Sequence, residues 1–416
     1  MDRMRIRWRG RWRLRRAATA LVALTLLPVA VLVGSAHAQA GALPPLAPWL
    51  HMDSLQPQDI DLPVAEALKR SEASNLFAPF GWDGQIVSGP FVEFDYSPTT
   101  GEIVGYFAVN GTSTTLLVNK IRVADFSPTS TPLVSGPTFV ASGSGVSLVV
   151  HDEPMALLEI RSQGQARTVV LRFPTGTTEM QVVYATDWPR SSLAFTVGAT
   201  HGRLILGRGS LTVNGTTATA QLETEDYLAL RAVPGFVEHA SERTAVLEAF
   251  ASGCLAAEYD LIAMSNGGWL ENSAQYQIGL TATSSHVEFS RATVTFGVME
   301  PRAGLVLLAF DPQTMPADPR HRLVVTESGV DVPEAANPVE SLYSLPGSSS
   351  HASFTRLAMN ATVLVVYLSD LSATPLQVES IALPTSGLDW PTELAMVAAA
   401  FVVSVAAAVM FRRPHE

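Results

Sequence analysis

Alternation of hydrophobic and polar residues dominates the middle of the chain. Val92, Phe94 and Tyr96 are separated by Glu93 and Asp95, a period of two that is typical of a strand with one buried face. Short apolar segments separated by Ser, Gly, Pro and Asp predict further strands at 103–107, 146–150, 156–160, 168–173, 180–184, 255–262, 274–281, 286–298, 304–310, 322–326, 362–368 and 376–383. The pattern therefore predicts a mainly β protein.

Two Asn-Gly pairs predict tight hairpins within this region. Asn110-Gly111 lies between the apolar segments FAV and TTLLV, and Asn214-Gly215 repeats the same V-N-G-T sequence. Asn and Gly accept positive φ most readily, so we expect each pair to occupy the two central turn positions. The likeness of the two segments reflects shared turn chemistry, because no longer repeat accompanies it.

Two segments have a helical pattern instead. Residues 63–75 begin with Pro, which suits a first helical position, and continue with helix formers. Residues 241–252 are expected to be capped by Ser241 and ended by Gly253. The apolar face of this second helix is expected to contain Val246, Leu247 and Phe250.

The C-terminal end carries an uncharged apolar segment at residues 394–411, followed by Arg412 and Arg413. As a helix it would span roughly 27 Å, close to the thickness of a bilayer's hydrocarbon core. The flanking arginines favour a cytoplasmic C-terminus. We therefore predict one transmembrane helix, which makes the lipid bilayer a partner of the chain.

The N-terminal end has the layout of a secretory signal peptide at residues 1–40. Eight arginines precede an apolar run at 17–33, and two A-x-A sites follow it. An uncleaved signal anchor is the alternative. Either outcome places the bulk of the chain outside the cytoplasm, and we expect a single-pass protein of a prokaryotic cell membrane.

These features divide the chain into eight parts. They are a signal peptide (1–40), a lead-in segment with a short helix (41–78), a first β-rich domain (79–235), a junction helix (236–254), a second β-rich domain (255–384), a stalk (385–393), the transmembrane helix (394–411) and a cytoplasmic tail (412–416). We expect the two β-rich domains to be β-sandwiches.

The exported part is strongly acidic. Without the two basic ends it retains 17 basic and 36 acidic residues, a net charge near −19. Such a surface repels nucleic acid, and we exclude nucleic-acid binding. Cys254 is the only cysteine, so an intrachain disulfide is excluded and we expect a buried thiol.

Candidate metal ligands occur in two places. His151 and Asp152 end a predicted strand, and His286 and Glu288 lie two apart on another strand, where both would point to one face. Neither group supplies a third ligand, so both are weak candidates beside an ordinary polar strand end. The paired carboxylates, Asp59 with Asp61 and Glu93 with Asp95, raise calcium as a hypothesis, but they lack the spacing of a calcium loop. We predict no cofactor.

Two further sets of residues are candidate modification or packing sites. The N-x-S/T sequons at Asn110, Asn214 and Asn360 are candidate glycosylation sites. Small residues recur every four positions in the C-terminal apolar segment, a pattern that would allow close helix packing and a homo-oligomer, although an Ala-rich segment also produces it by accident. They are Ala400, Ser404 and Ala408.

Motifs for local catalytic sites are absent from the sequence. It contains no G-x-S-x-G, S-x-x-K, H-E-x-x-H, C-x-x-C, G-x-G-x-x-G or P-loop sequence. This favours a non-enzyme, a cell-surface protein that serves binding, adhesion or envelope structure towards a protein or glycan outside the cell. A membrane-anchored extracytoplasmic hydrolase and an accessory subunit of a membrane complex are the alternatives.

Overall fold

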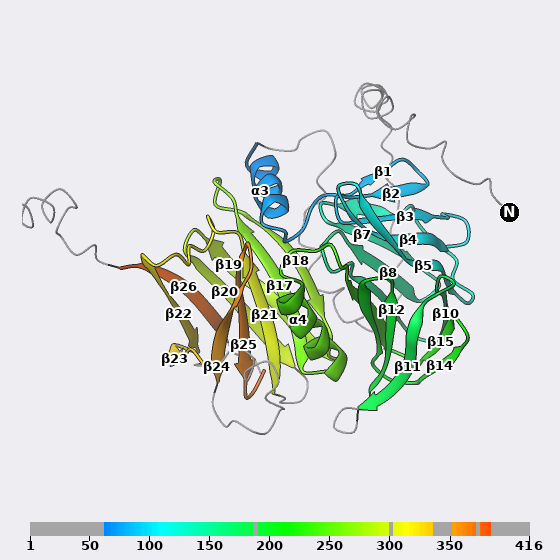
Figure 1. Ribbon diagram of the computed structural model, residues 1–416. Coiled ribbons are helices and arrows are strands. Elements are labelled where there is room, and N and C mark those ends of the chain that lie inside the picture. Colours follow the sequence, from blue (N-terminus) through cyan, green and yellow to red (C-terminus); the bar gives the residue numbers. More distant parts are fainter. Residues whose placement is uncertain (1–61, 186–189, 299–302, 336–351, 372–374, 384–416) are drawn as a thin grey trace, which may run out of the picture. The chain divides into compact units, whose positions relative to one another are not determined.

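The strands form four sheets, antiparallel except for one parallel pair in sheet C, and the sheets pack in pairs (Figure 1). The computed structural model describes residues 62–185, 190–298, 303–335, 352–371 and 375–383. All of these residues fall within one compact unit. The mainly β architecture predicted from the alternating pattern is confirmed.

Sheets A and B each contain eight strands. The order in sheet A is β1 (Gly81–Trp82), β2 (Ile86–Ser88), β3 (Val92–Tyr96), β4 (Ile103–Asn110), β5 (Ser113–Val123), β10 (Arg167–Arg172), β15 (Thr217–Leu222) and β14 (Ser210–Asn214). The order in sheet B is β11 (Thr178–Ala185), β12 (Arg190–Val197), β13 (Thr200–Leu206), β16 (Tyr227–Val233), β9 (Leu158–Ser162), β8 (Val146–His151), β7 (Thr138–Gly143) and β6 (Leu133–Ser135).

The core of the first sandwich lies between sheets A and B. Phe94 and Tyr96 of β3 pack against Phe139 of β7, with ring centroids 5.2 and 5.0 Å apart. Edge-to-face aromatic pairs of this kind stabilise a core by about 0.5–1.5 kcal/mol each beyond the area they bury. The alternation in β3 thus places its aromatic side chains between the sheets and its carboxylates outside.

Sheets C and D each contain five strands. The order in sheet C is β18 (Trp269–Gln275), β17 (Leu255–Ala263), β21 (Gly304–Phe310), β25 (Thr362–Leu368) and β24 (Ser353–Ala358). The order in sheet D is β19 (Leu280–Glu288), β20 (Arg291–Val298), β26 (Pro375–Ala382), β22 (His321–Glu327) and β23 (Val330–Val332). β17 and β21 run parallel.

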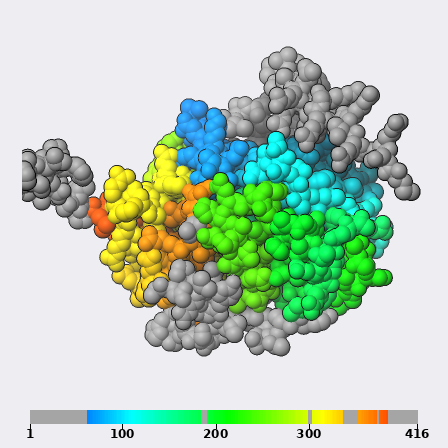
Figure 2. All heavy atoms as spheres, in the orientation of Figure 1, coloured from blue at the N-terminus to red at the C-terminus, as the bar shows by residue number. Residues whose placement is uncertain are grey.

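The core of the second sandwich lies between sheets C and D. Tyr259 of β17 meets Phe296 of β20 edge-to-face, with centroids 6.2 Å apart. Both sheets join strands that are distant in sequence, since β21 pairs with β25 and β22 pairs with β26. In Figure 2 these yellow and orange segments accordingly lie side by side.

The two expected helices are present as α3 (Leu62–Ala73) and α4 (Ala240–Ser252). Gly253 ends α4 with a φ of 83°, and its N–H donates to the carbonyl of Phe250 at 3.2 Å, as predicted. The predicted N-cap is wrong, because α4 begins one residue before Ser241. The chain enters through His239 in a left-handed conformation, and the Ser241 hydroxyl donates to Glu242 instead.

Both predicted hairpins form, but their turns begin one residue later than expected. Asn110 pairs with Ser113 and Asn214 pairs with Thr217, so both asparagines remain in strands. The two-residue loops begin with Gly111 and Gly215, each with a φ of 57°. Only the glycine takes the positive φ that we expected of both Asn and Gly.

A third apolar cluster joins the outer faces of sheets B and C. It includes Ala229 of β16, Phe250 of α4 and Leu307 of β21. α4 contacts β13 and β16 of the first sandwich and β17 of the second. β16, β21 and β25 are buried along their whole length, because both faces of their sheets are covered.

Among the described residues, no helix is both long and apolar enough to cross a membrane. The predicted transmembrane helix at 394–411 lies outside those residues, as do the signal peptide, the stalk and the cytoplasmic tail. The same holds for the small-residue stripe of Ala400, Ser404 and Ala408.

Candidate functional site

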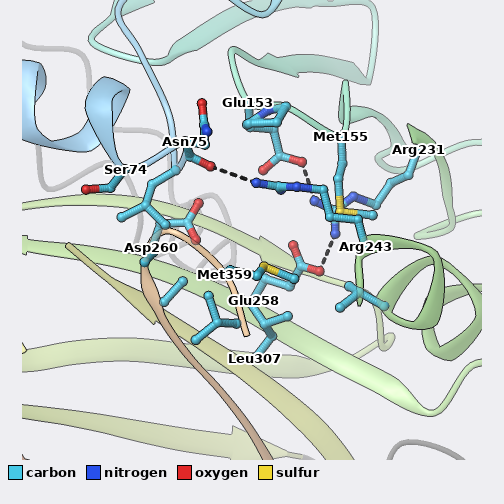
Figure 3. A pocket seen from close by; sticks show the side chains of 16 residues that line it. Ser74, Asn75, Glu153, Met155, Arg231, Arg243, Glu258, Asp260, Leu307 and Met359 are labelled. Atoms are coloured by element: carbon cyan, nitrogen blue, oxygen red, sulfur yellow. Dashed lines mark hydrogen bonds and ion pairs between the residues drawn. The ribbon is translucent and has the colours of Figure 1, made fainter. Parts of the chain in front are cut away.

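Buried ionisable side chains lie within the apolar interface between the sandwiches. The guanidinium of Arg231 on β16 contacts the carboxylates of both Glu153 and Glu258 (Figure 3). Glu153 follows β8 in the first sandwich, whereas Glu258 lies on β17 in the second. Arg231, Glu153 and Glu258 are only 2, 4 and 6% exposed. Arg231 therefore joins one carboxylate from each sandwich.

Strand alternation explains how these side chains reach the interface. In β16, Leu228 and Leu230 belong to the core of the first sandwich, so the side chain of Arg231 points to the opposite face. In β17, Tyr259 faces the core of the second sandwich, and Glu258 and Asp260 on either side of it face the first sandwich. The two strands thus present opposite charges to each other.

A cavity of about 40 Å³ lies beside this ion pair. Glu153, Arg231, Glu258 and Asp260 line it together with Arg243 of α4 (Figure 3). Arg243 donates from Nε to the carbonyl of Glu238 and from Nη2 to the carbonyl of Asn75, both at 3.2 Å. The space is enough for one or two ordered water molecules among the polar groups.

Asn272 on β18 extends the network towards β8. Its Nδ2 donates to Oε2 of Glu153 at 3.3 Å and to Oδ2 of Asp260 at 3.2 Å. Its Oδ1 lies 2.7 Å from Nδ1 of His151, whose Nε2 lies 3.9 Å from Oε1 of Glu159. We call the set Glu153, Arg231, Glu258, Asp260 and Asn272 the interface cluster.

Burial sets the protonation of this cluster. Burial raises the pKa of Glu258 to about 7, although the charge of Arg231 acts in the opposite direction. Burial also raises the pKa of Asp260 well above its usual value, and the nearby Glu153 carboxylate adds to the effect. Burial lowers the pKa of Arg243. A neutral solution therefore leaves protons on some of the carboxyl groups of the cluster.

The geometry suits a structural lock better than a reaction centre. The charges contact one another across the interface, and the cavity is far smaller than the several hundred Å³ of a usual small-molecule site. In the part of the chain that the structure describes, no group of three or more His, Cys, Asp and Glu residues could hold a metal ion. The cluster instead ties the two sandwiches together through buried ion pairs.

The structure separates His151 from Asp152, the first pair of candidate ligands. His151 joins the interface through Asn272. The Asp152 carboxylate points the other way, where its Oδ1 accepts from the backbone N–H groups of Phe91 and Val92 at 2.9 and 2.8 Å. Burial raises the pKa of Asp152 well above its usual value. β8 ends at His151, and the side chains of His151 and Asp152 bind different partners, so the two do not converge.

The second pair, His286 and Glu288, does come together. Nε2 of His286 lies 3.3 Å from Oε1 of Glu288 on β19, and both side chains are about half exposed, at 54 and 51%. Of the carboxylates considered for calcium, Glu93 and Asp95 lie on β3, and Asp59 and Asp61 fall outside the described residues. His286, Glu288, Glu93 and Asp95 do not belong to the interface cluster.

The sequons lie at exposed positions next to turns. Asn110 and Asn214 end the first strands of their hairpins and are exposed. Asn360 is also exposed, and its Nδ2 donates to the carboxylate of Glu238. Glycosylation at these sites stays a prediction. Cys254 is buried as a free thiol, as expected.

Sequence reasoning missed Arg231, Glu258, Asp260 and Asn272. Each of the first three interrupts an otherwise apolar strand, in the sequences YLALRAV and LAAEYDLIA. A charged residue inside a strand without alternation signals a buried pair, because an unpaired charge there would be too costly. This signal identifies the residues but does not name their partners.

Comparison with known proteins adds little to this description. No protein-family model matches the chain, and no curated protein sequence matches it. Among solved structures, the crystal structure of YidC from Thermotoga maritima is similar over 41% of this chain and 57% of that chain, with 12% identity and a TM-score of 0.28. The chain thus spans less than two thirds of that protein, and a TM-score this low supports no argument about function.

Proposed function

We propose that the chain is a single-pass cell-surface membrane protein whose acidic β-rich ectodomain serves binding, adhesion or envelope structure. The apolar segment at 394–411, its flanking Arg412 and Arg413, and the basic N-terminal segment support this location. The net charge near −19 between the two ends suits a soluble domain outside the cell.

The interface cluster is the main observation that favours a binding or structural role over catalysis. Arg231, Glu153 and Glu258 are buried against one another, and their charges hold the two sandwiches in a fixed arrangement. A hydrolase needs ionisable groups that face a substrate-sized space, whereas these face a cavity of about 40 Å³. A rigid pair of sandwiches presents its outer sheet faces to partners instead.

Membrane topology is the first test. The full chain carrying a C-terminal tag is expressed in bacterial cells, and the membrane fraction is washed with alkaline carbonate. We expect the chain to stay in the membrane, and we expect protease added outside the cell to remove the ectodomain and leave a small tagged fragment. A matched variant without residues 394–411 should leave the membrane fraction. Full-length chain released by carbonate, or protected from external protease, would refute the proposal.

A further inference from the structure

A basic cleft lies on the solvent-facing side of sheet A, away from the interface cluster. Lys120 and Arg122 of β5 line it together with Val170 and Arg172 of β10, and it encloses about 150 Å³. Arg122 and Arg172 are exposed and Lys120 is half-buried. Three cations therefore surround one hollow on a chain whose exported part is strongly acidic.

Strand register brings these cations together. Arg172 stands directly opposite Lys120, and Val170 stands opposite Arg122. Like charges placed opposite each other on one sheet face are destabilising. On the other side of Lys120 the register places Val104, whose side chain is 43% exposed. The cleft thus combines repelling cations with two exposed or half-exposed valines.

The carboxylate of Glu102 offsets this charge only in part. Glu102 accepts from Nζ of Lys120 at 2.8 Å and lies 3.7 Å from Nε of Arg122. Within the described ranges, Arg172 has no ion pair or hydrogen bond to another side chain. Lys120 and Arg122 therefore share one carboxylate, and Arg172 adds a third positive charge that has no ion-pair partner among the described residues.

We propose that this cleft binds an oxyanion, specifically a phosphate group. The planar fork of Arg172 can donate two parallel hydrogen bonds to phosphate oxygens, and Lys120 supplies a compact positive charge beside it. A bound phosphate removes the repulsion between Lys120 and Arg172, so binding stabilises the sheet. The phosphate site deepens the proposed function by naming a class of ligand. It rests on the proposed function only for the location of that ligand outside the cytoplasm.

The test is calorimetric titration of the purified full chain with inorganic pyrophosphate at low ionic strength. We expect Arg172→Gln to weaken binding about fivefold to tenfold, because one charge-assisted contact is lost. The control Arg322→Gln removes another exposed arginine, from sheet D, and should change nothing. Glu102→Gln should strengthen binding several-fold, an outcome that misfolding would not produce.

A second titration separates free phosphate groups from lipid headgroups. Dihexanoyl phosphatidylglycerol is compared with dihexanoyl phosphatidylcholine, both below their micelle concentrations. If either pyrophosphate or the phosphatidylglycerol binds, and R172Q weakens that binding, the proposed phosphate site is supported. The tighter of the two probes shows whether the site prefers a free phosphate group or a lipid headgroup. No binding of either probe, or binding equal in R172Q and wild type, overturns it. Membrane fractionation reports on the proposed location separately, so the two failures are distinguishable.

Discussion

Replacing Arg231 with Met removes the cation that Glu153 and Glu258 share, and it keeps a long apolar side chain in nearly the same space. Both carboxyl groups then stay buried, at 4 and 6% exposure, without a counter-charge. Removing one partner of a buried ion pair typically costs about 3–5 kcal/mol. We expect R231M to lower the free energy of unfolding by about that amount at pH 8.

The loss should shrink in acid. The pKa of Glu258 is already raised by burial from 4.5 to about 7 with Arg231 present, and removing Arg231 raises it further. A group whose pKa is raised on folding contributes stability that is present below its unfolded pKa and is lost as pH rises through its folded pKa. R231M should therefore lie closest to wild type near pH 5 and furthest from it above pH 8.

The measurement is denaturant unfolding of the full chain, followed by circular dichroism at pH 5, 6.5 and 8. Arg203→Met is the matched control, because Arg203 pairs with Glu248 at 2.5 Å while their side chains are 23 and 37% exposed. A partly exposed pair contributes about 1 kcal/mol or less. If R231M loses no more stability than R203M at pH 8, or loses the same amount at all three pH values, the buried ion pairs do not stabilise the interface as proposed.

Three further changes test other parts of the structure. Wild-type stability should fall by roughly 3 kcal/mol between pH 4.5 and 7 from Glu258 alone, and Glu258→Gln should flatten that part of the melting-temperature profile. Asp152→Ala should lower the free energy of unfolding by about 2–4 kcal/mol, because two buried N–H groups lose their acceptor. Asp152→Asn keeps an acceptor oxygen, so it should lower that free energy far less in the same denaturant assay. Gly111→Ala should lower the free energy of unfolding by about 1–2 kcal/mol, because a φ of 57° is unfavourable for alanine and no neighbouring atom adds a clash. An unchanged unfolding midpoint would contradict the turn geometry.

Local patterns predicted the elements of the fold better than their details. The alternation of Val92, Phe94 and Tyr96 identified a strand with one buried face. The Asn-Gly pairs located both hairpins but misplaced their turns by one residue. The reason is physical: the turn takes positive φ where Gly111 stands, and Asn110 pairs with Ser113 inside the ladder, which satisfies its backbone.

The interface cluster could be predicted only in part. His151 stood out in the sequence, but its partner is Asn272, which lies 121 positions away, rather than the adjacent Asp152. β8 ends at His151 and the two adjacent side chains bind different partners, so proximity in the sequence does not make them ligands of one site. The contact of Arg231 with Glu258 depends on how the outer faces of sheets B and C meet, which no local pattern encodes.

β16, β21 and β25 lack alternation between apolar and polar residues, and this pattern indicates how the two sandwiches are arranged. A strand that is buried at every position needs cover on both faces, so sheets B and C each pack on a sandwich core and on each other. Two groups of charges in the described chain then differ in location. Arg231 and its carboxylates are paired inside this double layer and fix the arrangement of the sandwiches. The cations of the basic cleft face solvent on sheet A with a partner for only part of their charge. Mutation should therefore separate the two groups: R231M should change stability without changing phosphate binding, and R172Q should do the reverse.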